Sequence, residues 1–318
     1  NAFRAAVEAV WQVLLTMAWR MSTKHGSYAL LEARRLGVAA AKKLLLPDHI
    51  QAKHDEVAKN LKPPSHWDLS AMGVQGGGQL SPDAPGAAPK LKDSELKQLQ
   101  ALLNETYRRR PSSDPHSAFA PTGIEVVWGL RIQNWQTWRS YAVRREAIRE
   151  DMREARPETK PFADSTGMST HMEALGIRLD QEANVRWLFH GITTDAADKV
   201  KNKDFDVDVA SPEAGRLYGR GVYMTELCSR VDKFAAEEVG GMHCMLLCRV
   251  MLGNALRDTA VLPDTVHCIT QCTEGPYHSV VGDREEKMPG ATRDYVVYDK
   301  DQVYPELLLW YKRVYAKK

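Results

Sequence analysis

The chain has 318 residues, with 43 Lys and Arg against 41 Asp and Glu, and a net charge of +2. Hydrophobic residues make up 43% and charged residues 26%, as in ordinary globular proteins, and the length suits about two domains. The balanced charge excludes any argument from overall electrostatics for nucleic acid or an anionic membrane as partner. Because the first residue is Asn1 rather than Met, we expect the chain to be part of a longer protein.

The first segment, residues 1–62, has the apolar periodicity of helices. Three helices are predicted, over Phe3–Met21, Ser27–Leu46 and Asp48–Leu61, and the first is too short and too charged to cross a membrane. Residues 26–46 also resemble one degenerate ankyrin-like repeat, although a single repeat cannot bury its own apolar face. Two interpretations of this segment remain: a small helical bundle, or a unit that binds a partner.

The stretch 63–92 is predicted to be a flexible linker. It holds Gly76-Gly77-Gly78 and several prolines, which interrupt helices and strands. A composition of this kind buries too little apolar surface to offset the entropy of ordering it. We therefore place a domain boundary here, with a second domain over 93–318.

The second domain combines helical periodicity with strand-like runs. A helix is predicted over Asp93–Arg110, with Ser94 as its N-cap, and another from Asn134 onward. Apolar runs predict strands at 124–132, 188–191, 245–254, 278–281, 294–299 and 306–315. Periodicity alone thus predicts a mixed α/β domain with many strands.

One stretch of this domain, Leu188 to Phe234, combines strand ends with glycines. An apolar run ends in His190-Gly191, and a second run, Gly219-Arg220-Gly221-Val222-Tyr223, delivers a tyrosine. The two glycines of the second run allow the backbone to approach a ligand or another strand closely. The segment Asp204–Leu217 between them predicts a loop long enough to act as a lid.

In their order and spacing, these residues resemble the NAD-binding core of the poly(ADP-ribose) polymerase family of diphtheria-toxin-like ADP-ribosyltransferases. Arg131-Ile132-Gln133-Asn134 and the later strands are similar too, so the resemblance covers 93–318. It implies an α+β fold, the ADP-ribosyltransferase fold of two packed, mostly antiparallel sheets, here preceded by a small helical region. It also implies a pentosyltransferase that uses NAD as substrate, requires no metal and modifies protein acceptors, the chain itself among them.

The same resemblance implies roles for individual residues. The catalytic residues would be His190, Tyr223 and Asp294. His190 would hold the adenosine-side ribose, the backbone of Gly191 would bind the nicotinamide amide, and Tyr223 and Phe234 would stack on the nicotinamide ring. The cofactor-binding residues would be His190, Gly191, Tyr218, Gly221, Tyr223, Ser229 and Phe234.

Two positions depart from the family pattern. The serine that binds the nicotinamide amide falls on Val231, which has no donor, and Ser229 is the nearby candidate to replace it. Asp294 stands where the polymerases carry a glutamate, and it could also be a solvated acid at the start of a strand. We assign no catalytic role to Glu306. Mono- and poly-ADP-ribosylation therefore both stay open, with a catalytically impaired NAD- or ADP-ribose-binding module as the alternative.

Cysteine and histidine clusters give a rival interpretation, a zinc site. The clusters are His243-Cys244 with Cys248, and His267-Cys268 with Cys272. On a strand, Cys244 and Cys248 would lie about 13 Å apart, too far to share one zinc ion. We therefore favour buried thiols and predict no metal site. The odd number of cysteines argues against a secreted disulfide framework, so we expect the cytoplasm or the nucleus.

Overall fold

The structure, a computed structural model, describes residues 48–73, 80–81, 84, 86–109, 120–155, 167–202, 217–237, 240–285 and 287–316. The first two predicted helices, the ankyrin-like stretch 26–46 and, apart from Leu217, the predicted lid Asp204–Leu217 lie outside these residues. No helix within the described ranges has an apolar stretch long enough to cross a bilayer.

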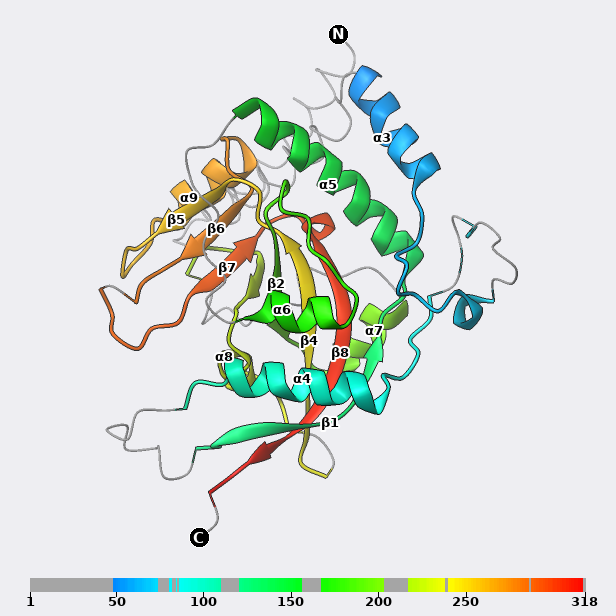
Figure 1. The fold of residues 1–318 in the computed structure, drawn as a ribbon. Helices are drawn as coiled ribbons and strands as arrows, with labels where there is room; N and C mark the ends of the chain where they lie inside the picture. The colour runs from blue at the N-terminus through cyan, green and yellow to red at the C-terminus, as the bar shows by residue number, and fades with distance from the viewer. Residues whose placement is uncertain are drawn as a thin grey trace, which may run out of the picture.

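Two four-stranded sheets form the centre of the described structure (Figure 1). The first runs in the order β1 (Gly123–Arg131), β8 (Val303–Val314), β4 (Met242–Met251) and β2 (Val185–Gly191), with antiparallel neighbours. The second runs in the order β3 (Val222–Met224), β7 (Asp294–Val297), β6 (Ser279–Gly282) and β5 (Ala255–Asp258), and its β5–β6 pair is parallel. The predicted α+β fold with two mostly antiparallel sheets is therefore confirmed.

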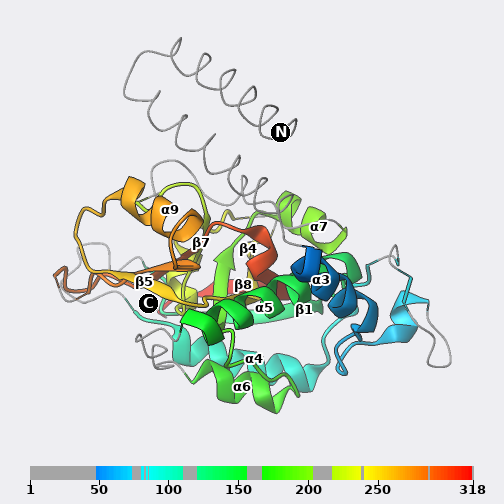
Figure 2. The ribbon, with the colours of Figure 1, turned by 90° about the horizontal axis from the view of Figure 1, so that it is seen from above.

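Helices pack on both sheets: α4 (Asp93–Thr106), α5 (Trp135–Ala155) and α6 (Met168–Ala174) lie on the first sheet and α9 (Thr265–Thr273) on the second (Figures 1 and 2). The others in the described ranges are α3 (Asp48–Asn60), η1 (Leu69–Met72), α7 (Thr194–Asn202), α8 (Cys228–Asp232) and η4 (Lys300–Gln302). The helix predicted from residue 93 is α4. It begins one residue before Ser94, and the Glu95 carboxylate accepts the N–H of Lys92 at 2.8 Å. Ser94 thus lies in the first turn rather than at the cap.

The first sheet separates two apolar cores, because side chains alternate between its faces. Leu246 and Leu308 belong to the core shared with the second sheet and α7. Their neighbours Leu247 and Leu309 belong to the opposite core, under α4, α6 and α8. The second sheet is covered on its outer face by α9, where Ile269 packs with Val280 and Val296 of the strands. Even-numbered residues of β2, His190 among them, therefore face the second sheet.

A third core lies where α5 packs against the first sheet. Trp67 is buried there, with ring centroids 6.1 Å from Trp138 and 6.2 Å from Tyr304. Leu91, also from the stretch predicted as a linker, is buried and donates its backbone N–H to Gly129 at 2.9 Å. These described parts of 63–92 are packed, which their composition did not indicate. The division of the chain into domains stays a prediction.

Candidate active site

The two sheets meet through a short backbone bridge near the end of β2. Phe189 and Thr225 exchange two hydrogen bonds, of 2.7 and 3.1 Å. Phe189 belongs to β2 of the first sheet, and Thr225 directly follows β3 of the second. The residue after Phe189 and the residues before Thr225 are therefore held together at the junction of the sheets.

His190 is fixed at this junction by the backbone of the opposite sheet. Its ring is 3% exposed, and Nδ1 lies 2.8 Å from the carbonyl oxygen of Tyr223. Because a carbonyl only accepts hydrogen bonds, Nδ1 carries the proton in this contact. Burial lowers the pKa of His190, and the Tyr223 carbonyl opposes that shift. The imidazole is therefore neutral near pH 7, with its lone pair on Nε2.

The Tyr223 side chain is also fixed, by the turn that precedes its strand. Its hydroxyl donates to the carbonyl of Gly219 at 2.9 Å and accepts the N–H of Tyr218 at 2.8 Å. Because the hydroxyl both donates and accepts a hydrogen bond, the orientation of the Tyr223 ring is fixed. The structure thus brings His190 and Tyr223, two of the three predicted catalytic residues, into direct contact.

The two glycines of this turn approach protein rather than open space. Gly219 has a φ of +85°, and a Cβ on it would lie 2.6 Å from Ile269 of α9. A Cβ on Gly221 would lie 2.8 Å from Val296 of β7. Of the two alternatives in the sequence, a ligand or another strand, packing against α9 and β7 accounts for both glycines.

Tyr218, predicted to bind the cofactor, has its ring in the core. The residue is fully buried, and its hydroxyl lies so close to Gly282 that a Cβ there would be 2.1 Å away. Its carbonyl accepts the hydroxyl of Tyr298 at 2.7 Å. The burial of the Tyr218 ring is therefore explained by its packing beneath α9.

Asp294, the third predicted catalytic residue, begins β7 and lies between two arginines. It is 7% exposed, so it is not a solvated acid at the start of a strand. Its carboxylate oxygens lie 3.6 Å from Nε of Arg230 and 3.7 Å from an Nη of Arg284. Burial raises the pKa of Asp294, and both arginines oppose that shift.

Val231, the residue predicted to stand at the position of the family's serine, lies on the short helix α8. A Cβ on Gly191 would lie 3.4 Å from Cγ1 of Val231, so the valine adjoins the backbone predicted to bind the nicotinamide amide. The hydroxyl oxygen of Ser229 accepts the backbone N–H of Arg108 at 3.1 Å. Ser229 is thus directed toward the segment after α4, and Val231 is the α8 side chain against Gly191.

Phe234 follows α8 and presents an exposed ring that an arginine covers. The residue is 60% exposed, and the guanidinium carbon of Arg230 lies 5.1 Å from the ring centroid. Arg230 therefore touches both Phe234 and Asp294. Arg230 was not among the predicted site residues, and it reaches Phe234 because the chain turns directly after α8, with the Phe234 N–H donating to the Val231 carbonyl at 3.0 Å.

The thiols predicted from the cysteine pattern are free, and four of the five are buried. Cys244 and Cys248 lie on β4, whereas Cys268 and Cys272 lie on α9. Across the described residues, no group of three or more His, Cys, Asp or Glu side chains is arranged to hold a metal ion.

Comparison with known proteins matches residues 169–313 to the poly(ADP-ribose) polymerase catalytic domain. A relative, the protein mono-ADP-ribosyltransferase PARP12 of Mus musculus, is 28% identical over 131 residues, which cover 41% of this chain and 17% of that protein. The match spans less than a fifth of this relative's length. Over the matched residues, the resemblance stated from the sequence is confirmed.

Proposed function

We propose that the chain is an NAD-dependent ADP-ribosyltransferase, because residues 169–313 match the poly(ADP-ribose) polymerase catalytic domain. In the proposed reaction the bond between nicotinamide and ribose C1′ breaks, and its electron pair leaves with nicotinamide. A nucleophile of a protein acceptor then bonds to C1′ and loses its proton. The ribose passes through an oxocarbenium-like state, so fixed groups around it determine the rate.

The single observation that carries this proposal is the contact between His190 and Tyr223 across the two sheets. In the tautomer set by the Tyr223 carbonyl, the Nε2 lone pair of His190 would accept a hydroxyl of the adenosine-side ribose. The Tyr223 ring, held by Gly219 and Tyr218, would stack on the nicotinamide ring. Because both groups are positioned before NAD binds, little entropy is lost in arranging them.

Three residues around this pair complete the proposed site. The backbone of Gly191 would bind the nicotinamide amide, Phe234 would form the opposite wall, and Asp294 would stabilise the positive charge that develops on the ribose. Whether one ADP-ribose unit or a polymer is added depends on Asp294, which is one methylene shorter than the glutamate of the polymerases.

The proposal is tested with the purified chain and NAD labelled in its ADP-ribose part. We expect nicotinamide release and label on protein, and His190→Ala and Tyr223→Ala should each abolish both. His267→Ala, at an exposed position of α9, is the matched control. A sharp labelled band indicates single-unit transfer and a high-molecular-weight smear indicates elongation. Full activity in both site variants would contradict the assignment.

A second candidate, an NAD- or ADP-ribose-binding module without turnover, is favoured by the side chains around α8. Val231 offers no donor beside Gly191, so an unpaired ligand amide would cost about 1–3 kcal/mol. Arg230 covers the Phe234 ring and lies near the carboxylate of Asp294. NAD binding without nicotinamide release would support this module, and Val231→Ser combined with Asp294→Glu would then be the variant to restore turnover.

A further inference from the structure

A polar pocket of about 430 Å³ lies beside α5, at the opposite end of β2 from the candidate active site. It is lined by arginines of α5 and β4, by the turn 178–182, and by Val185 at the start of β2. His190 lies five residues further along this strand, about 16 Å away at a rise of about 3.3 Å per residue. The pocket is thus separate from the proposed NAD site.

Two deeply buried side chains, those of Tyr141 and Arg249, line this pocket. Tyr141 is 1% exposed, and within the described residues its hydroxyl makes no hydrogen bond. Burial raises its pKa to about 12, so the hydroxyl keeps its proton near pH 7. Arg249 has an 8% exposed side chain and pairs with Glu306 through Nη2 at 2.7 Å, whereas its buried Nε makes no hydrogen bond in the described structure. The Tyr141 hydroxyl is therefore the donor available to an acceptor bound in this pocket.

The pocket lining is rich in arginine. It includes Arg145, Arg149, Arg178 and Arg249 together with the carboxylates Asp180 and Glu182, while Glu306 and Glu146, outside the lining, lie 2.7 Å from Arg249 and 2.9 Å from Arg149. Arg145 and Arg149 share one oxygen of Asp180, which lies 3.5 Å from Nε of Arg145.

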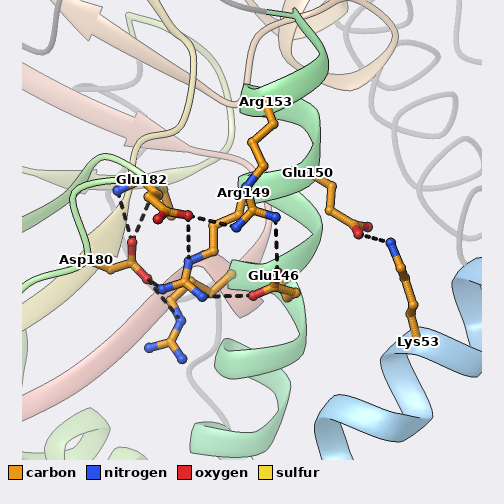
Figure 3. Close-up of polar contacts among 9 residues, drawn as sticks. Lys53, Glu146, Arg149, Glu150, Arg153, Asp180 and Glu182 are labelled. Carbon is orange, nitrogen blue, oxygen red and sulfur yellow. Dashed lines mark hydrogen bonds and ion pairs between the residues drawn. The ribbon is translucent and has the colours of Figure 1, made fainter.

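Both lining carboxylates are already paired, which leaves Arg178 as the lining cation without a partner in the described residues. Figure 3 shows Glu182 also reaching Arg153, outside the pocket lining, at 2.8 Å. The other oxygen of Asp180 accepts backbone N–H groups of the turn, at 3.0 and 3.2 Å. Arg178 is exposed and has no hydrogen bond or ion pair in the described part of the chain.

We propose that this pocket binds the pyrophosphate group of a small-molecule ligand. Guanidinium groups present donors in a planar fork that fits phosphate oxygens, and a phenol adds a further donor. The volume lies within the range of small-molecule sites, about 300–1,000 Å³. The few apolar lining groups, Leu179 and Val185 among them, leave recognition to the charged part of the ligand. The proposal does not depend on the proposed catalytic function.

The proposal is tested by calorimetric titration of the full chain with inorganic pyrophosphate, at an ionic strength matched with sodium chloride. We expect saturable binding of one pyrophosphate per chain. Arg178→Gln and Tyr141→Phe should each weaken it about tenfold or more, the usual effect of losing a hydrogen bond to a charged group. Arg139→Gln, on α5 but outside the pocket lining, should leave binding unchanged. Circular dichroism checks that each variant is folded.

Two further titrations identify the source of the group. Inorganic phosphate that binds as tightly as pyrophosphate would overturn the assignment to a pyrophosphate. ADP-ribose that still binds His190→Ala, and is weakened by Arg178→Gln, would identify a nucleoside diphosphate sugar as the ligand. The site itself is overturned if pyrophosphate gives no saturable heat, or if Arg178→Gln binds it as wild type does.

Discussion

Two buried carboxylates, Glu306 on β8 and Asp294 on β7, both lie among arginines, but their pKa values shift in opposite directions. Burial by itself raises the pKa of Glu306, yet Arg249, His66 and Arg131 outweigh it and lower the pKa to about 2. Their nitrogen atoms lie 2.7, 2.6 and 3.3 Å from its oxygens. At Asp294, the two nearest guanidinium nitrogens lie 3.6 and 3.7 Å away, and burial raises the pKa.

The difference teaches that contact geometry, rather than the number of arginines, sets the charge of a buried acid. Coulomb attraction changes only modestly between 2.7 and 3.7 Å. Charge-assisted hydrogen bonds, in contrast, need donor–acceptor distances below about 3.2 Å, and Glu306 has two such contacts. Glu306 is therefore a permanently ionised structural group. At Asp294, burial outweighs the two more distant arginines and raises the pKa.

Glu306→Gln is the strongest test of the structural half of this comparison. It leaves Arg249 and Arg131 buried without their counter-charge, so the free energy of unfolding should fall by about 3–5 kcal/mol. Chemical denaturation at pH 7 measures the change, and Glu125→Gln, at an exposed position of β1, should shift it by less than about 0.5 kcal/mol. A loss below about 1 kcal/mol in Glu306→Gln would contradict the structural role.

The two carboxylates should change the pH dependence of the free energy of unfolding in opposite directions. The folded pKa of Glu306 is about 2 against an ordinary 4.5, so its contribution is complete above pH 4.5 and is lost as the pH falls toward 2. This amounts to roughly 3 kcal/mol. Asp294 has a raised folded pKa, so its contribution is present below its ordinary pKa of 3.8 and is lost as the pH rises through the folded value.

Denaturation of wild type, Glu306→Gln and Asp294→Asn between pH 2 and pH 7 checks both signs. The deficit of Glu306→Gln should shrink in acid. Asp294→Asn should gain stability relative to wild type as the pH rises. Parallel curves for the three proteins would show that neither pKa is shifted by folding.

The sequence predicted most of the strands and the chain order of the site, because alternation and glycine placement are local signals. The placement of His190 and Tyr223 at strands was predicted in this way, whereas their roles were implied by the family resemblance and stay predictions. The partners of Asp294 were not predicted, since only the fold brings Arg230 of α8 close to Asp294, 64 positions further along the chain. Tyr218 and Trp67 show the same limit, because only the packing of α9 and α5 decides that their rings are buried. The charge state of Glu306 likewise depends on strands β1 and β4, which bring its arginines.

Asp294→Asn tests the catalytic half of the comparison. The amide keeps the shape of the side chain but removes the negative charge proposed to stabilise the ribose cation, so kcat for nicotinamide release should fall about 100-fold. The matched change Asp294→Glu keeps the charge and should retain activity to within about tenfold, since only its position moves. Equal activity of wild type and Asp294→Asn would leave Asp294 as a structural acid, like Glu306.

Arg230→Ala should have the smallest effect and in the opposite direction, because it removes a side chain that covers the proposed nicotinamide site. The guanidinium lies over the Phe234 ring, a contact of about 0.5–1 kcal/mol at an exposed site, and must leave before another ring can stack there. We expect the KM for NAD to fall about threefold to fivefold with little change in kcat, as measured by initial rates of nicotinamide release. Arg284→Ala is the control, because Arg284 pairs with Asp294 but makes no recorded contact with Phe234. An equal fall in KM in both variants would assign the effect to the charge beside Asp294, whereas a rise in KM in Arg230→Ala would mean that this arginine binds NAD rather than blocking it.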